Sequence, residues 1–180
     1  MSLAPPFTAE TAHKKVKVAQ DLWNTQRDPE RIAKVYTTDS IWRNRNKFLS
    51  GTEDITEFLT WKWQKEKNYK FVFVPIRAYV HCLGAALTCL IANMYRLRKE
   101  LFTFSSNKIA VQFWYEYQDS HDGMKWKRCY GLEDWTYDDA DGGKMRKRMM
   151  SGNDVEISED ERWFKDGVDV NSVDISEKHW

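Results

Sequence analysis

The feature that most constrains the fold is a change of hydrophobic period about halfway along the chain. Near its start, Ala12, Val16, Ala19 and Trp23 recur at the spacing of one helix face. In the second half, apolar and polar residues alternate, which is typical of strands with one buried face. Four strands are predicted there: Tyr95–Phe104, Lys108–Gln118, Lys125–Trp135 and Lys144–Gly152. Helices followed by a strand meander predict an α+β fold with the helices on one face of a mostly antiparallel sheet.

Local signals place three helices before the meander. Thr8 can cap the first helix, and Asp28 followed by Pro29 is typical of the start of a short second one. A strand is predicted over Ser40–Arg45, and a third helical pattern begins at Gly51. At 180 residues the chain fits one domain, residues 1–180, with enough length to bury a core.

Charge and cysteine content exclude several classes of function. The net charge of +1 gives no overall attraction to nucleic acid or to acidic membranes. Residues 156–180 form an acidic extension of charge −5 against +6 for the rest, which is typical of a solvated tail or a docking arm. Cys82, Cys89 and Cys129 have no metal-type spacing and suit a reducing compartment. Because Met1–Phe7 also lacks signal-peptide features, we expect a cytoplasmic protein.

A long series of short phrases resembles one known family. They are Trp23-Asn24-Thr25 with Asp28-Pro29-Glu30-Arg31, Tyr36-Thr37-Thr38-Asp39-Ser40, Trp42-Arg43-Asn44-Arg45, Gly51 with Phe58-Leu59, Arg96–Leu101, Arg128–Gly131, Glu133 with Trp135, and Asn153-Asp154. The chain resembles a SnoaL-like family of unknown function, of bacteria and fungi, within the nuclear transport factor 2-like superfamily. The resemblance covers about residues 5–165 apart from one gap. It implies three N-terminal helices packed on a strongly curved sheet, a cone with a central pocket.

The resemblance does not imply one activity. The superfamily includes isomerases, dehydratases, polyketide cyclases, epoxide hydrolases and non-catalytic transport or dimerisation modules, so the fold alone does not assign a function. Its steroid isomerases resemble this chain around Tyr36–Phe58, and their general-base aspartate then falls on Arg43. A guanidinium that is always charged cannot abstract a proton, so that mechanism is not carried over.

Residues 70–95 interrupt the family pattern with an apolar insertion. Phe71–Met94 contains one formal charge, Arg77. A membrane-spanning helix, a buried hairpin or helix, and an intron translated in frame are the alternatives. We favour the intron, because removing residues 70–95 joins Tyr69 to Arg96 and restores the family pattern without a gap.

Strand alternation supplies candidates for the pocket lining. Small-molecule sites are mostly apolar with a few convergent polar groups. The candidates are Trp42, Asn44, Arg98, Glu100, Gln112, Trp114, Glu116, Arg128 and Arg148. Such a set could bind an anionic or polar aromatic ligand, or support acid–base chemistry if burial raised the pKa of a carboxylate. The alternative is that these charges lie on the solvated face and pair across strands.

Other kinds of site are not predicted. His13, His121 and His179 are scattered, and no zinc pattern, phosphate loop or nucleophile elbow is present, so we expect no metal and no cofactor. The basic run Lys144–Arg148 alternates on a strand beside acidic loops, which disfavours nucleic-acid binding. The sequence therefore favours a homodimeric pocket protein that binds a small polar or aromatic molecule, with a cofactor-independent lyase, isomerase or hydrolase as the catalytic form of this hypothesis. The rival hypothesis is a non-catalytic homodimerising interaction module.

Overall fold

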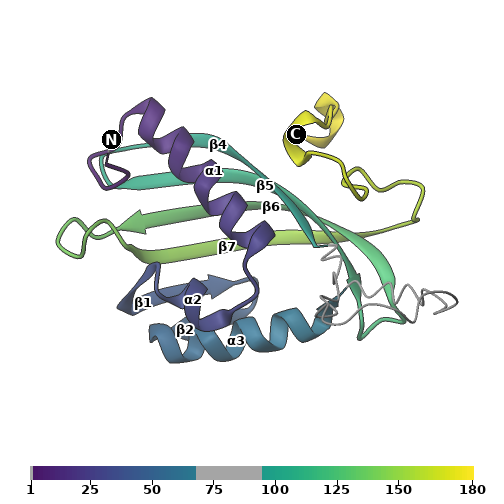
Figure 1. The fold of residues 1–180 in the computed structure, drawn as a ribbon, viewed down its shortest axis with the longest axis horizontal. Helices are drawn as coiled ribbons and strands as arrows, with labels where there is room; N and C mark the ends of the chain where they lie inside the picture. The colour runs from purple at the N-terminus through teal and green to yellow at the C-terminus, as the bar shows by residue number, and fades with distance from the viewer. Residues whose placement is uncertain (1, 68–94) are drawn as a thin grey trace, which may run out of the picture.

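The computed structural model, which describes residues 2–67 and 95–180, has the predicted order of helices and then a strand meander (Figure 1). The helices and strands are α1 (Ala9–Thr25), α2 (Pro29–Ala33), β1 (Tyr36–Asn44), β2 (Lys47–Ser50), α3 (Gly51–Lys65), β3 (Glu66–Lys67), β4 (Arg96–Phe104), β5 (Lys108–Asp119), β6 (Lys125–Tyr137) and β7 (Met145–Ile157). Two short 3-10 helices follow, η1 (Val170–Ser172) and η2 (Glu177–His179). The predicted α+β class is confirmed.

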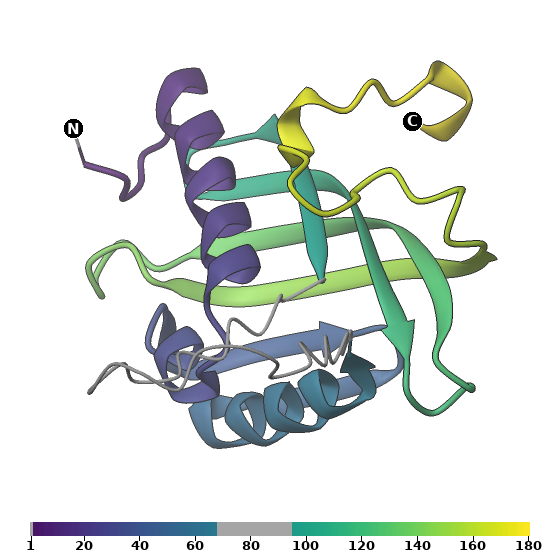
Figure 2. The same ribbon diagram turned by 45° about the vertical axis from the view of Figure 1, so that its right-hand side comes forward.

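The seven strands form one curved sheet in the order β2-β1-β7-β6-β5-β3, with β4 also paired to β5. Every pair is antiparallel except β1 with β7, so the prediction of a mostly antiparallel sheet is confirmed. Figure 2 shows β5 and β6 bending strongly along their length, while α1 crosses the concave side and α3 lies beside β1. The concave face and these helices enclose the main core.

Two predicted strand boundaries are wrong by several residues, because β7 continues to Ile157 beyond the predicted end at Gly152, and β1 starts early. The first strand begins at Tyr36, four residues before the predicted start, because Tyr36 already pairs with Met145 of β7. It ends at Asn44, since Arg45 takes a left-handed conformation with φ 58° in the turn to β2. The tight turn between two strands was not visible in the sequence, because Arg45 is not a residue that favours this conformation.

The first helix follows from its sequence pattern and also completes the sheet edge. Thr8 and Thr11 form a reciprocal capping box at its start, and Val16 and Trp23 are buried as the spacing predicts. On its polar side, Asn24 accepts from the Leu97 amide and donates to the Leu97 carbonyl, each at 2.8 Å. The α1 side chains thus satisfy backbone groups along the edge of β4 that no strand pairs with.

The strands β3 and β4 pair with the same edge of β5, almost in continuous register. Lys67 lies opposite Gln118 and Arg96 lies opposite Glu116, so a single β5 residue separates the two registers. The predicted insertion 70–95 lies between these strands and, apart from Tyr95, falls outside the described residues. Tyr95 is buried, with its ring centroid 5.0 Å from that of Tyr115.

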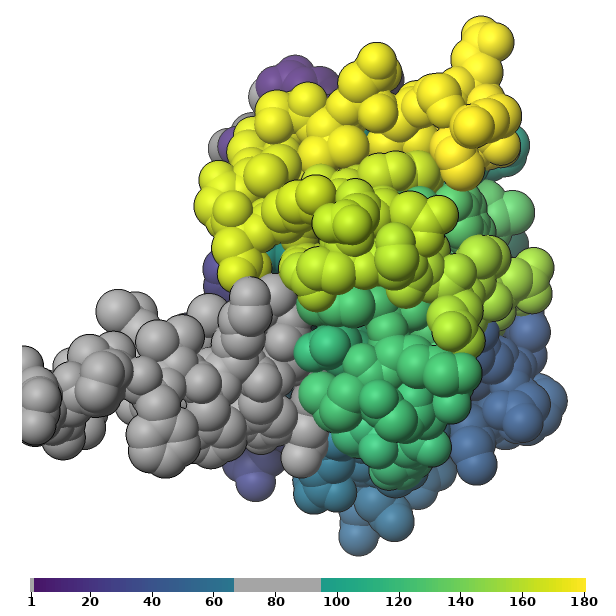
Figure 3. Space-filling model, turned by 90° about the vertical axis from the view of Figure 1, so that its right-hand side faces the viewer, coloured from purple at the N-terminus to yellow at the C-terminus, as the bar shows by residue number. Residues whose placement is uncertain are grey.

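The C-terminal segment packs back on the convex, outer face of the sheet. Figure 3 shows it as the yellow-green to yellow surface lying against the green strands. Phe164, Val170 and Ile175 form a second apolar cluster with Trp114 of β5. Most acidic residues of this segment stay exposed, so its apolar side chains hold it to the sheet. Within the described ranges, no helix is long and apolar enough to cross a membrane.

Candidate functional site

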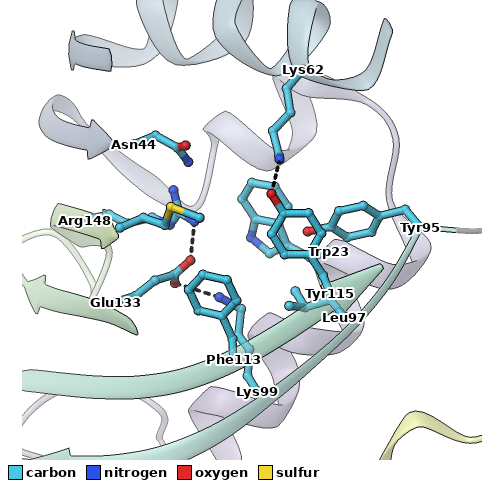
Figure 4. Close-up of a pocket in the computed structure, with 11 residues that line it drawn as sticks. Trp23, Asn44, Lys62, Tyr95, Leu97, Lys99, Phe113, Tyr115, Glu133 and Arg148 are labelled. Carbon is cyan, nitrogen blue, oxygen red and sulfur yellow. Dashed lines mark hydrogen bonds and ion pairs between the residues drawn. The ribbon is translucent and has the colours of Figure 1, made fainter. Parts of the chain in front are cut away.

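The candidate site is a polar cavity on the concave face, named here the polar chamber. Figure 4 shows Asn44 of β1, Lys62 of α3 and Arg148 of β7 pointing toward its centre. The remaining walls come from Trp23, Tyr95, Leu97, Lys99, Phe113, Tyr115, Glu133 and Met150. Its cavity volume is about 10 Å³, which is room for about one water molecule.

A buried ionic triad of Glu133, Lys99 and Arg148 forms the floor of this chamber. Glu133 accepts hydrogen bonds from Lys99 Nζ at 2.7 Å, from Trp135 Nε1 at 2.7 Å, and from Arg148 Nη2. The three charged residues are each at most 4% exposed. Ions removed from water in this way are tolerated only with partners at hydrogen-bond distance, and the triad supplies them.

The triad shifts the pKa values of its own members. Burial disfavours the charge of Glu133, but Arg148 and Lys99 outweigh it and lower the pKa of that carboxyl to about 2. Burial lowers the pKa of Lys99 to about 8, against the attraction of Glu133. Glu133 is therefore an anion throughout the physiological range, whereas Lys99 lies near the point where it can release or accept a proton.

In the described residues, the polar chamber contains hydrogen-bond donors that have no acceptor within the protein. Arg148 Nη1 has no hydrogen-bond partner in the described part of the chain, although the guanidinium lies 4.7 Å from the Trp42 ring and 5.2 Å from the Trp23 ring. Among the described residues, the Asn44 side chain also forms no hydrogen bond, and it is 4% exposed. Lys99 and Arg148 oppose one carboxylate, so the triad has one positive charge in excess.

A second ion pair closes the far side of the chamber. Lys62 Nζ pairs with the carboxylate of Glu66, and both side chains are nearly buried. The Tyr115 hydroxyl lies 3.4 Å from Lys62 Nζ and 3.4 Å from Arg45 Nη2. Burial lowers the pKa of Lys62, while Glu66 raises it. Because Glu66 neutralises Lys62, the excess positive charge remains with the triad.

A larger hollow, named here the apolar chamber, adjoins the polar one and shares Trp23, Glu133 and Arg148 with it. Its cavity volume is about 90 Å³, against about 10 Å³ for the polar chamber. The other lining residues are Lys15, Val18, Ala19, Leu22, Val35, Tyr36, Trp135, Tyr137 and Met145. The hollow lies between α1 and strands β1, β6 and β7. The two chambers together have an aromatic and aliphatic part and a charged part, joined at Arg148.

Three of the nine predicted pocket residues lie at this site. Asn44 and Arg148 line the polar chamber, and Trp42 packs against Arg148. The other six lie on the outer side of the sheet and do not line either chamber: Arg98, Glu100, Gln112, Trp114, Glu116 and Arg128. Gln112 and Trp114 border a shallow cleft of the outer face, and Glu100 pairs with Lys17 and Arg98.

Glu116 and Arg128 anchor the C-terminal segment on the outer face. They are register partners on β5 and β6, and Glu116 accepts from Arg128 Nε at 2.8 Å. The same carboxylate accepts from the backbone amides of Trp163 at 2.9 Å and Phe164 at 3.0 Å. Arg128 also lies 3.5 Å from the centre of the Trp163 ring. This arrangement is a cross-strand pair covered by the segment, rather than a ligand site.

Glu133 and Lys99 were missed as site residues, although one sequence signal could have found them. Lys99 lies two residues from both Leu97 and Leu101, so the three side chains share one face of their strand. In the same way, Glu133 shares a strand face with Trp135. A lone charge on an apolar strand face must be paired when that face is buried. In the described residues, no group of three or more His, Cys, Asp or Glu side chains is placed to hold a metal ion.

Comparison with solved structures supports the fold. One match is SalBIII, an epoxide hydrolase/cyclase-like enzyme with a role in pyran ring formation in the polyether salinomycin. Its TM-score is 0.54 at 9% identity, and the match covers 81% of this chain and 93% of that one. The phenazine biosynthesis-related protein phzb2 of Pseudomonas aeruginosa matches at 0.53 and 12%, over 79% of each chain. A protein of ketosteroid isomerase-like fold from Catenulispora acidiphila, in complex with trimethylamine, matches at 0.50 and 8%, over 76% and 82%. At these identities the likeness shows the fold alone.

Sequence comparison gives the family directly. No match is found among curated protein sequences. Residues 5–76 and 91–165 match the family described as "Protein of unknown function (DUF1348)". Those two stretches make up most of the 180 residues, and they include every residue of the ionic triad. With its nuclear transport factor 2-like fold, the chain therefore belongs to the DUF1348 family.

Proposed function

We propose that this protein binds a small anionic molecule where the two chambers meet, with Arg148 as the anchor and one anionic oxygen in the water-sized space of the polar chamber beside Asn44. The observation that carries the proposal is the unused Arg148 Nη1 donor in a triad with one excess positive charge. A buried charge without a counterion is unfavourable, so a monoanion would gain by neutralising it. Arginine also suits carboxylates, because its planar fork presents parallel donors.

Lys99 supplies the feature that favours a catalytic form of this proposal. Its lowered pKa of about 8 would allow it to exchange a proton with a bound molecule, while Glu133 holds its ammonium in place. That chemistry fits a cofactor-independent lyase, isomerase or hydrolase. Among structures of similar fold is an epoxide hydrolase/cyclase-like enzyme, which is consistent with such a role. Binding is the primary proposal, and catalysis would follow from it.

The test is titration of acetate, the smallest carboxylate probe, into the wild type and Asn44→Leu at pH 7. Asn44 forms no side-chain hydrogen bond in the described structure, and leucine has a similar size, so this variant should fold. We expect acetate to bind the wild type and to bind Asn44→Leu about tenfold more weakly, the effect of one hydrogen bond to a charged group. The matched control, Asn153→Leu, makes the same change at an exposed site on the outer face and should bind like wild type.

Two results would contradict the proposal. One is the absence of acetate binding to the folded wild type at millimolar concentration. The other is equal binding by the wild type and Asn44→Leu, because the anion would then lie outside the polar chamber. NMR titration suits weak binding of this kind, and a circular dichroism spectrum confirms that each variant is folded.

A second candidate function is a homodimerising interaction module, supported by apolar side chains on the outer face. Phe102 is 67% exposed and Leu132 is 53% exposed on that face. Such exposure can mark a surface for a partner. Sedimentation at micromolar concentration tests the idea: a dimer that Leu132→Lys dissociates would support it, and a wild-type monomer would count against it. A cytoplasmic location remains part of this proposal, and a buried free thiol at Cys129 is consistent with it.

A further inference from the structure

Resting on the anion site proposed above, we infer that the ligand also has a ring-sized apolar body, and that this body lies in the apolar chamber. The chambers meet at Arg148, which lines both of them. A molecule whose anionic group reaches Arg148 would therefore have its remaining atoms on one of two sides. The polar side has room for about one water molecule, so only the apolar side can hold a ring.

The walls of the apolar chamber select for an uncharged, flat or aliphatic group. Leu22 and Val35 contribute aliphatic surface, and Tyr36, Trp135 and Tyr137 contribute rings. Rings packed edge to face add to the gain from burial alone. The cavity volume of about 90 Å³ lies below the ~300–1,000 Å³ of drug-sized sites, so the chamber has room for no more than a single ring. A six-membered ring is the size of body that this space favours.

The charges around the two chambers also oppose a cationic or neutral head group. Arg148 lies at the junction, Lys99 lines the polar chamber, and Lys15 lines the apolar chamber with its ammonium 4.9 Å from the centre of the Tyr137 ring. The one carboxylate at the junction, Glu133, is already occupied by three hydrogen-bond donors. An amine would meet these cations without a free acceptor. The class that satisfies both chambers is a cyclic or aromatic monocarboxylate of about the size of benzoate.

The experiment compares four probes on the wild type: acetate, benzoate, cyclohexanecarboxylate and benzyl alcohol. We expect both cyclic acids to bind at least about tenfold more tightly than acetate, because each buries a ring. Benzyl alcohol, which keeps the ring without the charge, should bind more weakly than benzoate. If acetate binds and the cyclic acids bind no more tightly, the inference fails while the anion site stands. If neither acetate nor the cyclic acids bind, both proposals fail.

Variants locate the ring. Ala19→Leu fills the apolar chamber from α1 and should weaken benzoate at least about tenfold while leaving acetate unchanged. Ala9→Leu makes the same change at an exposed position of the same helix and should leave both affinities unchanged. Should Ala19→Leu fail to fold, Val18→Trp decides, since Val18 lines the chamber yet is 47% exposed. Benzoate binding that neither filling variant reduces would overturn the inference.

Discussion

Replacing Glu133 by glutamine should strongly destabilise the protein, because it removes the only anion from the buried triad. The change keeps the shape of the side chain but leaves Lys99 and Arg148 buried with no countercharge of their own. Breaking a buried ion pair in this way costs about 3–5 kcal/mol. The pKa of Glu133 gives a matching magnitude, since a fall from 4.5 to about 2 corresponds to about 3 kcal/mol. For a chain of this length the melting temperature should fall by roughly 6–20 °C.

Urea unfolding at pH 7 measures the effect, and its dependence on pH identifies the cause. The pKa of Glu133 is lower in the folded state, so its stabilisation is complete above about pH 4.5 and is lost as the pH falls toward 2. The difference in unfolding free energy between wild type and Glu133→Gln should therefore shrink over that acidic range. The control is Glu57→Gln, at an exposed position of α3, which should change stability by less than about 0.5 kcal/mol.

A double-mutant cycle separates lost pairing from general damage. In the Glu133→Gln background, Lys99→Met removes one of the two uncompensated cations and should restore part of the stability. In the wild type the same Lys99→Met change also breaks the ion pair with Glu133, so it should not stabilise the protein to the same extent. The reasoning would be refuted if Glu133→Gln were within about 1 kcal/mol of wild type at pH 7, or if the two changes were additive.

Three further predictions concern the fold around the site. Gly131→Ala should cost about 1–3 kcal/mol in thermal unfolding, because the added Cβ would lie 2.1 Å from Phe113 Cζ; unchanged stability would contradict this packing. Glu116→Gln should weaken the anchor of the C-terminal segment, seen as faster proteolysis within residues 158–180 with the core intact; an equal rate would argue against the anchor. Deleting residues 70–95 should leave a folded chain, since β3 and β4 nearly share one register on β5, with a lower melting temperature because buried Tyr95 is lost; an unfolded product would contradict the intron hypothesis.

The sequence alone determined the three main helices, the five longer strands and which residues share a strand face, but not the short strands β2 and β3. Helical spacing placed Val16 and Trp23 on one buried side of α1, and the Thr8 and Asp28 caps began helices where the structure has them. Alternation correctly grouped Gln112, Trp114 and Glu116 on one side of β5 and Phe113 and Tyr115 on the other. These properties are local, because backbone period and capping hydrogen bonds involve residues close in the chain.

Only the tertiary structure decided which face of the sheet encloses the cavity. Alternation is symmetric, so the pattern that places Glu116 with Arg128 on one side is equally compatible with either side being concave. The direction of curvature and the covering elements break that symmetry: α1 and α3 cover the side of Glu133 and Lys99, and the C-terminal segment covers the side of Glu116. These contacts join residues far apart in the chain. The sequence thus determined the two candidate faces, and long-range packing made one of them a site and the other an anchor.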